Sequence, residues 1–285
     1  MNSPITTNTP RLSSALPYDI ISVCGEDATT FLQSQFTCDI HQVTEAASPA
    51  AYCDRKGKVL CRLHIRKKDN EYQLLVHNSN TASFMKTIKR YSLFSRLELT
   101  PLTDYICYGL IGNRESIELP PTVDCWSLNN TLAIFQTSHE QADALSASLE
   151  PHITSCDENA WRHALQLASY IEIHPETSLQ FTPQMLGMDK HSGLCFNKGC
   201  YLGQEVIART QHLGKVKRGI AHFTWHNETS AAINSNITDQ DNRSVGTLLQ
   251  MTPLGEQQFF GTACFTLSAL SSDLFLLSTP ISLTQ

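Results

Sequence analysis

The chain has 285 residues, of which 41% are hydrophobic and 17% are charged, and its formal net charge is −6. This length predicts about two or three domains, and the composition excludes a disordered, charge-rich chain. The negative net charge argues against a protein that coats nucleic acid through bulk electrostatics. Any RNA contact must therefore involve a local basic patch.

The N-terminal residues and the cysteines indicate the compartment. Residues 1–17 lack the basic start and the hydrophobic stretch of a secretory signal, and no apolar run is long enough to span a membrane. We therefore expect a cytoplasmic protein whose ten cysteines are thiols, most of them buried. His191, Cys195 and Cys200 lack a compact pair and a fourth ligand, so no metal site is predicted.

The first part of the chain predicts an α+β arrangement. Ser, Thr and Pro are frequent in residues 1–17, which we expect to form a flexible tail. Alternating apolar residues predict strands, and apolar residues at helical spacing predict helices that cover them. Strands are expected at 18–23, at 50–54 and 58–66 as a hairpin with one buried face, and at 72–76, with helices after Asp27 and around 84–91.

The remainder of the chain predicts a second αβ layer and then a small β domain. Asp157 is a suitable N-cap for a helix that carries Trp161 and Leu165. Beyond Gly219 the short strands and polar loops are typical of a small barrel or a sandwich. The other elements are expected as strands at 105–111, 131–136, 220–225, 245–251, 259–266 and 274–277 and as a helix at 140–149.

The most informative segment is Asn197–Arg209, in which Cys200 precedes the expected start of a helix near Leu202. Gln204 and Glu205 would lie in the first turn of this helix, where an acidic side chain is favoured. A thiol beside a cation such as Lys198 and a helix start can have its pKa lowered from about 8.5 to roughly 3.5–7.5. The pattern therefore favours a thiolate at neutral pH.

Two glycines flank this cysteine and leave two interpretations open. Gly199 and Gly203 can adopt positive φ angles or let a ligand approach the backbone, which would suit an anionic or strongly polar partner. The alternative is a tight turn into a core helix, with Cys200 buried and inert.

The eight residues Lys198–Glu205, KGCYLGQE, resemble the signature K-G-C-Y-x-G-Q-E of the YgfZ family. The resemblance extends from Tyr18 onward and includes Asp54-Arg-Lys-Gly-Lys58 and Phe181-Thr-Pro-Gln184. It implies a fold like that of the glycine cleavage aminomethyltransferase, tetrahydrofolate or another folate as ligand, and support of iron–sulfur enzymes. These enzymes include the radical enzyme that methylthiolates certain tRNAs.

The resemblance also implies a domain organisation and a set of site residues. Two intertwined α+β units would occupy 18–212, a small β-barrel would occupy 213–285, and folate would lie in a central cleft. Cys200 would be the reactive thiol, and Lys198 its electrostatic partner or a contact to an anion. Tyr18 and Trp161 would stack on the pterin. The full set of implied folate contacts is Tyr18, Trp161, Asp54, Tyr201, Gln204, Glu205 and Arg209.

Three features qualify these assignments. The family pattern Arg-Ile-x-x-Gly-x-Pro appears here as Gln166–Glu172, QLASYIE, which loses the Arg, the Gly and the Pro and affects the folate contacts of that segment. Asp54 could orient a folate amine, but Asp-x-x-Gly is also a common hairpin turn. Gly214–Arg218 together with Arg209 forms a basic hinge that suits phosphate, the folate glutamate tail or tRNA, or is a solvated linker.

Three functions remain open from the sequence. The first is a folate-dependent factor for the assembly or repair of iron–sulfur proteins, and hence for tRNA methylthiolation, which acts as an accessory factor rather than a conventional enzyme. The second is an aminomethyltransferase that transfers a one-carbon unit to tetrahydrofolate. The third is a folate-sensing binding module without catalysis. Direct contact with tRNA is left open, and no membrane partner is expected.

Overall fold

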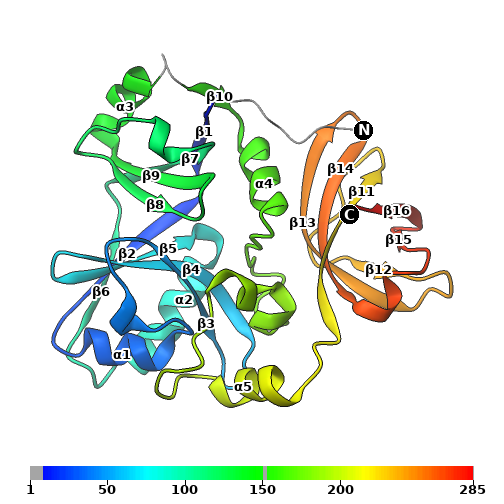
Figure 1. The fold of residues 1–285 in the computed structure, drawn as a ribbon, viewed down its shortest axis with the longest axis horizontal. Helices are drawn as coiled ribbons and strands as arrows, with labels where there is room; N and C mark the ends of the chain where they lie inside the picture. Colours follow the sequence, from blue (N-terminus) through cyan, green and yellow to red (C-terminus); the bar gives the residue numbers. More distant parts are fainter. Residues whose placement is uncertain (1–8, 150–152, 285) are drawn as a thin grey trace.

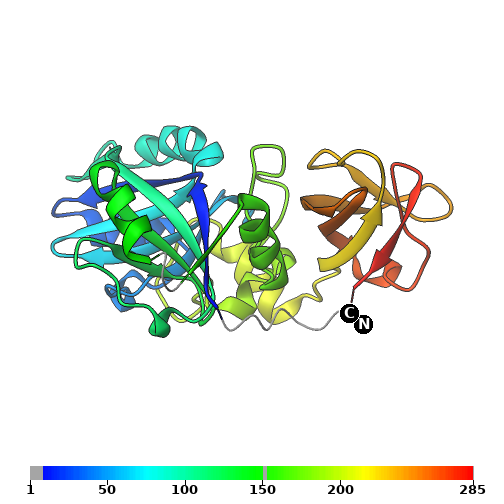
Figure 2. The same ribbon diagram turned by 90° about the horizontal axis from the view of Figure 1, so that it is seen from above.

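The computed structural model describes residues 9–149 and 153–284. Within these residues two five-stranded sheets form an N-terminal body, and a closed barrel forms a separate C-terminal body (Figure 1). Helix α4 lies between the two bodies in both views (Figures 1 and 2). The α+β class, the intertwined units and the C-terminal barrel are thereby confirmed.

The first sheet has the strand order β10-β1-β7-β9-β8. Strand β1 pairs antiparallel with β7 and parallel with β10, so strands far apart in the sequence are neighbours. Helix α3 packs on this sheet through Leu145 and Leu149, which join Phe135 in one buried cluster. The elements are β1 (Arg11–Leu16), β7 (Tyr105–Ile111), β8 (Asp124–Ser127), β9 (Leu132–Ser138), β10 (Thr154–Cys156) and α3 (Ala142–Leu149).

The second sheet has the strand order β3-β4-β5-β2-β6 and is covered by α1 and α2. Phe36, Tyr52 and Phe84 pack ring against ring in its core. The chain enters the first sheet as β1, leaves it to build the whole second sheet, and then returns. The elements are β2 (Tyr18–Cys24), β3 (Ser48–Cys53), β4 (Val59–Lys68), β5 (Glu71–His77), β6 (Glu98–Leu102), α1 (Ala28–Gln35) and α2 (Asn78–Tyr91).

The barrel closes in the order β11-β14-β13-β12-β15-β16, and it decides between the two architectures that the strand spacing allowed. Phe223, Trp225 and Phe265 fill its interior. Gln166 of α4 donates hydrogen bonds to Phe260 O (3.3 Å) and Thr262 Oγ1 (3.1 Å) of β14 and so ties the barrel to the rest of the chain. The elements are α4 (Glu158–Leu167), α5 (Gln204–Leu213), β11 (Arg218–His226), β12 (Asn236–Thr238), β13 (Ser244–Gly255), β14 (Gln258–Thr266), β15 (Phe275–Leu276) and β16 (Thr279–Leu283).

Short 3₁₀ helices lie in the connections between these elements. They lie at Ile40–Gln42, Arg114–Ser116, His139–Gln141, Pro183–Leu186, Met188–His191 and Leu267–Ala269. In the described part of the chain no helix combines the length and the apolar character needed to cross a bilayer.

The structure differs from the sequence prediction at the N-terminus. Residues 1–17 were expected to be a flexible tail, whereas Arg11–Leu16 form strand β1 in the middle of the first sheet. Ser13 is buried, and its Oγ accepts a hydrogen bond from Gly109 N at 2.7 Å. Pairing on both sides therefore orders a segment whose composition is that of a loop. Residues 1–8 of the expected tail lie outside the described residues.

The structure also differs on strand β4, for which one buried face was predicted. Cys61, Leu63 and Ile65 form that face, and Val59 packs in a separate buried cluster. Arg62, His64 and Arg66 on the opposite face are each less than 9% exposed. Arg66 forms a salt bridge with Asp124 of the first sheet (2.9 Å), because the two sheets pack against each other across this face. Polar residues at alternate positions of β4 thus face the middle of the molecule rather than solvent.

Candidate functional site

The signature segment forms an exposed bend ahead of helix α5. Cys200 is exposed, whereas the next residue, Tyr201, is 6% exposed and packs with Phe181 and Ile207. The helix begins at Gln204, two residues later than expected, and Gly203 is its N-cap. Residue 200 therefore stands on the surface at the edge of a buried cluster, and the expectation of a buried Cys200 is wrong.

Gly203 of the signature and Gly57 of the Asp54–Lys58 turn are required for the same physical reason. Gly203 has φ of +83°, and a Cβ there would lie 2.4 Å from Asp54 O. Gly57 has φ of +68°, and a Cβ there would lie 3.1 Å from Ile207 Cγ1. Only glycine permits the left-handed conformation without strain and such a close approach. The two motifs are therefore parts of one site, in which the hairpin turn packs directly on the start of α5.

Asp54 acts within this turn as a hydrogen-bond acceptor. Its Oδ1 accepts from Lys56 N (2.9 Å) and from Lys58 N (2.8 Å). Gly57 N also donates to Asp54 O at 3.0 Å. These contacts match the common hairpin turn that the sequence left open as the alternative for Asp54.

Lys198 anchors the bend to the end of helix α1. Its Nζ donates to Gln33 O (2.7 Å), Phe36 O (2.7 Å) and Cys38 O (2.6 Å). An ammonium group has three hydrogens, and all three are used by these carbonyls at the C-terminal end of α1, where a cation is favoured. Burial lowers the pKa of Lys198 to about 8. The geometry directs this cation to the backbone, and the role of partner to the Cys200 thiol stays a prediction.

The implied folate contacts divide into two groups. Tyr201, Gln204, Glu205 and Arg209 lie on or beside the start of α5, and Glu205 and Arg209 are exposed. Tyr18 and Trp161 lie in a different place, in the apolar cluster that joins the two sheets and α4. In the sequence, Tyr18 and Trp161 were the only residues of this cluster that were identified as candidates for the site.

A buried polar network surrounds this second group. Tyr18 donates its phenolic hydrogen to Glu172 Oε1, and His77 Nε2 lies 4.0 Å from Glu172 Oε2. Burial, followed by the charge of Glu172, raises the pKa of Tyr18 well above its usual value. Trp161 is 2% exposed and lies so close to Gly109 that a Cβ there would be 2.4 Å from its ring. The ring of Trp161 is thus enclosed here, unlike an open stacking surface.

The departures at Gln166–Glu172 from the family pattern build much of this network. Tyr170 Oη lies 2.9 Å from His64 Nδ1, and the guanidinium of Arg62 stacks 3.4 Å from the centre of the Tyr170 ring. Nε and Nη1 of Arg62 are buried without a hydrogen-bond partner in the described structure. Sequence reasoning missed Arg62 and His64, although charged residues at alternate positions of an otherwise apolar strand were a usable signal.

Comparisons with known proteins agree with this organisation. No family model matches the chain. It is 27% identical over 220 residues to the tRNA-modifying protein YgfZ of Colwellia psychrerythraea, covering 71% of this chain and 68% of that protein. It is 28% identical over 244 residues to the tRNA-modifying protein YgfZ of Sodalis glossinidius, covering 76% and 74%. The chain is therefore similar to proteins described as YgfZ over most of its length.

Two further likenesses are consistent with that relationship. An uncharacterised protein of Haemophilus influenzae is 29% identical to this chain over 230 residues, covering 80% of this chain and 78% of that protein. The fold resembles the crystal structure of glycine cleavage system aminomethyltransferase T from Bartonella henselae, with a TM-score of 0.75 and 12% identity, covering 98% of this chain and 85% of that one. This second likeness concerns the fold alone.

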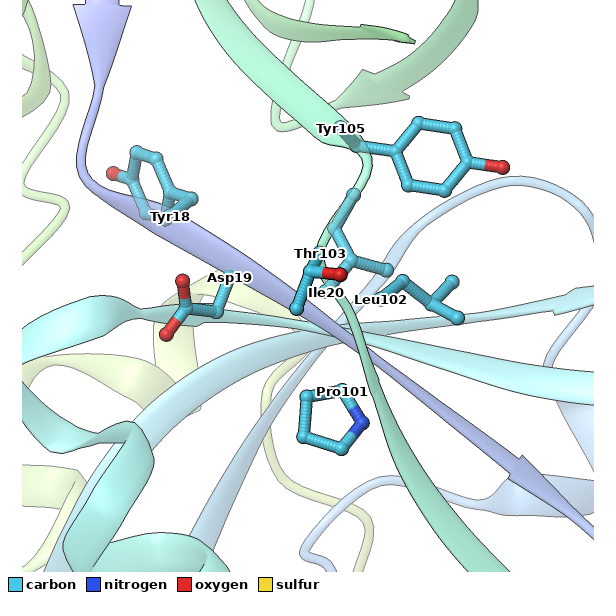
Figure 3. A pocket seen from close by; sticks show the side chains of 7 residues that line it. All are labelled: Tyr18, Asp19, Ile20, Pro101, Leu102, Thr103 and Tyr105. Carbon is cyan, nitrogen blue, oxygen red and sulfur yellow. The ribbon is translucent and has the colours of Figure 1, made fainter. Parts of the chain in front are cut away.

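Two cavities of the structure lie near these groups. One, of about 260 Å³, has Tyr18 and Asp19 on one side and Tyr105 on the other (Figure 3), and its full lining is Tyr18, Asp19, Ile20, Pro101, Leu102, Thr103 and Tyr105. The second, of about 400 Å³, is lined by Cys38, Asp39, Gln42, Ala47, Ser48, Pro49, Ser192 and Cys195. Cys200 lines neither of these two, so the expected opening beside this thiol is not one of them.

The network makes the stability of the protein sensitive to acid through His64. Burial, followed by the charge of Arg62, lowers the pKa of His64 to about 3. The folded state therefore keeps His64 neutral, while the unfolded chain takes up a proton below its ordinary pKa of about 6.5. The free energy of unfolding falls with the pH, by up to about 1.4 kcal/mol per pH unit. It is therefore about 2 kcal/mol lower at pH ~5 than at neutral pH. Urea unfolding at about pH 7 and about pH 5 measures this loss.

Other acid-titrating groups contribute to the same curve, so a variant isolates His64. In His64→Gln the loss between about pH 7 and about pH 5 should shrink by about 2 kcal/mol relative to the unmodified protein. An equal loss in both proteins would show that His64 does not remain neutral in the folded state.

Proposed function

We propose that this protein is a folate-binding accessory factor for tRNA modification, which supports iron–sulfur enzymes of tRNA methylthiolation through the thiol of Cys200. The single observation that carries the proposal is the exposure of this thiol. All ten cysteines lie among the described residues, and Cys200 alone is exposed, while five are buried and four are partly buried. A thiol that serves another protein or its cluster must be reachable from solvent.

The bend that carries Cys200 supports the proposal because it is fixed on both sides. Lys198 donates a hydrogen bond to the carbonyl of Phe36 at the end of α1, and Tyr201 is buried beside α5. Gly199 has no atom within 4 Å of the position that a Cβ would take, which leaves open space next to the thiol. A reactive group on a fixed bend with free approach suits contact with a large partner.

The polar network supports folate as the ligand. Arg62 offers two buried N–H groups without partners, which suit acceptor atoms of a heterocycle or a carboxylate. Tyr18 connects this network to the cavity of about 260 Å³, a volume that suits a pterin ring rather than a whole folate, since sites for whole ligands measure about 300–1,000 Å³. Tyr18, which lines the cavity, would hold the ligand there, whereas Arg62 lies in the adjoining network outside the lining. A bound reduced folate would supply one-carbon chemistry.

The names of the relatives support the link to tRNA. Two of the proteins to which the chain is similar are described as tRNA-modifying protein YgfZ. The fold shared with aminomethyltransferase T leaves one-carbon transfer as an alternative, but the exposed thiol favours the accessory role.

Replacing Cys200 by Ala tests this function. In cells that lack the native protein, the variant is expected to restore less than about a tenth of the methylthiolated nucleosides in tRNA that the unmodified protein restores. Mass spectrometry of digested tRNA gives the measurement. Removal of an exposed side chain is expected to change the free energy of unfolding by less than about 0.5 kcal/mol.

Cys125→Ala, which removes a partly buried thiol from the first sheet, is the matched control and should restore full modification. Full modification with Cys200→Ala would refute the role of the thiol.

Calorimetric titration with tetrahydrofolate should show equal binding to Cys200→Ala and to the unmodified protein. One-carbon transfer in a glycine-cleavage assay would favour the aminomethyltransferase alternative, and folate binding with no effect of Cys200→Ala would favour a sensing module.

A further inference from the structure

The exposed face of α2 carries an unusual concentration of positive charge. Residues 78–97 contain Lys86, Lys89, Arg90 and Arg96 and no Asp or Glu, in a chain whose net charge is −6. Lys86, Lys89 and Arg90 are exposed, and none of the ion pairs found in the described residues includes them. Positions 86, 89 and 90 are three and four residues apart, so these cations share one face of the helix. Figure 2 shows α2 at the outer edge of the N-terminal body.

The turn after α2 adds exposed apolar side chains to the same place. Phe94 is 99% exposed, Leu93 is 73% exposed and Tyr91 is 39% exposed. The helix expected around 84–91 was to cover the sheet along its length, but it ends at Tyr91, which is exposed. A fully exposed Phe next to other apolar side chains is typical of an interaction surface.

The turn is held in position rather than free. Ser95 N donates to Ser92 O (2.9 Å), and Arg96 N donates to Asp27 Oδ2 (2.7 Å). The Arg96 side chain pairs with Glu26 at 2.5 Å. Arg96 thus fixes the turn to the start of α1, and Phe94 is presented from a defined backbone.

We propose that this surface, consisting of Lys86, Lys89, Arg90, Leu93 and Phe94 and named here the α2 patch, binds tRNA. The three cations contact backbone phosphates, and Phe94 stacks on an unpaired base. Interleaved cations and aromatic rings are what single-stranded regions of RNA require. The proposal rests on the proposed function in tRNA modification and adds that the protein itself contacts the RNA.

Helix stabilisation alone does not account for this surface. Lys89 and Arg90 lie in the last turn of α2, where cations interact favourably with the helix dipole. That effect does not extend to Lys86, which lies outside the last turn, and it gives no reason for an exposed Phe94. A surface of purely apolar character would suit a protein partner, whereas the charge here is complementary to a polyanion.

Fluorescence anisotropy with an in vitro transcribed tRNA tests the proposal. The protein should bind with an affinity that falls as salt rises, and Lys86→Gln/Lys89→Gln/Arg90→Gln should reduce the slope of log K against log salt by about 2–3, since each phosphate contact contributes about 0.9. Phe94→Ala should weaken binding by about tenfold and leave the slope unchanged, because stacking releases no counterions.

The control variant Lys67→Gln/Lys190→Gln/Arg243→Gln removes the same charge from exposed cations outside the α2 patch and the basic hinge, and should keep both the affinity and the slope. Three outcomes would overturn the proposal: no tRNA binding by the unmodified protein, an equal loss in the control variant, or binding to vesicles containing phosphatidylserine in place of tRNA. Since Cys200→Ala is read out by tRNA methylthiolation, the proposed function can stand when the α2 patch fails, and the reverse result is equally visible.

Discussion

Replacing Lys198 by Met is expected to lower the free energy of unfolding by about 2–4 kcal/mol, because three carbonyl oxygens lose their donor at once. These are Gln33 O, Phe36 O and Cys38 O, each within 2.7 Å of the ammonium group. Met has a similar length and retains the packing of the aliphatic stem, so the loss reports on the hydrogen bonds. Urea unfolding followed by tryptophan fluorescence measures the effect.

Lys215→Met is the matched control, since Lys215 is exposed and its replacement should change stability by less than about 0.5 kcal/mol. Unchanged stability in Lys198→Met would contradict the anchoring role and return Lys198 to the thiol chemistry that the sequence predicts. A loss of stability as expected means that any loss of function in Lys198 variants must be compared at equal amounts of folded protein.

Gly203→Ala is expected to lower the free energy of unfolding by more than about 3 kcal/mol. The left-handed backbone at Gly203 disfavours any Cβ by about 1 kcal/mol, and the Cβ would stand 2.4 Å from Asp54 O, a backbone atom that cannot rotate away. The hairpin turn and the start of α5 would have to separate. Thermal unfolding and the soluble yield of the variant measure this cost.

The neighbouring Gly199 provides the control within the same motif. Its backbone is not in the left-handed region, and a Cβ there meets no atom within 4 Å, so Gly199→Ala should unfold like the unmodified protein. Equal stability of the two variants would show that the turn and α5 are not in the close contact described. The pair thus separates glycines required by packing from glycines beside an open surface.

The sequence predicted the elements whose apolar residues follow a simple period. Strands β2, β4, β5, β7, β9 and β14 and helices α2 and α4 occur where alternation or helical spacing placed them, and the N-cap Asp157 accepts from Ala160 N as expected. Strand β1 was missed because Ser13 and Ser14 interrupt its apolar pattern. Its order comes from neighbours distant in the sequence, which no local window contains.

The candidate site was predictable only in part for the same reason. The signature motif located Cys200, and the structure confirms that this thiol is exposed. Lys198 donates to backbone carbonyls at and just beyond the end of α1, more than 150 residues earlier in the chain, and carbonyls carry no sequence signal. The two buried faces of β4 depend on how the two sheets pack, and so the network around Arg62 could not be derived from the strand itself.

The path of the chain between the two sheets has a consequence for synthesis and folding. Ser13 of β1 meets Gly109 of β7, 96 residues later, and the strand is flanked on its other side by a contact between Pro10 and Thr154, 144 residues apart. Pairing between such distant segments closes long loops and slows folding. During translation one edge of β1 must wait for residues 105–111 and the other for residues beyond 150, whereas every strand of the second sheet lies within 18–102. The first sheet is therefore the last part of the N-terminal body to be completed, and until then the nascent chain carries a strand with an unpaired edge.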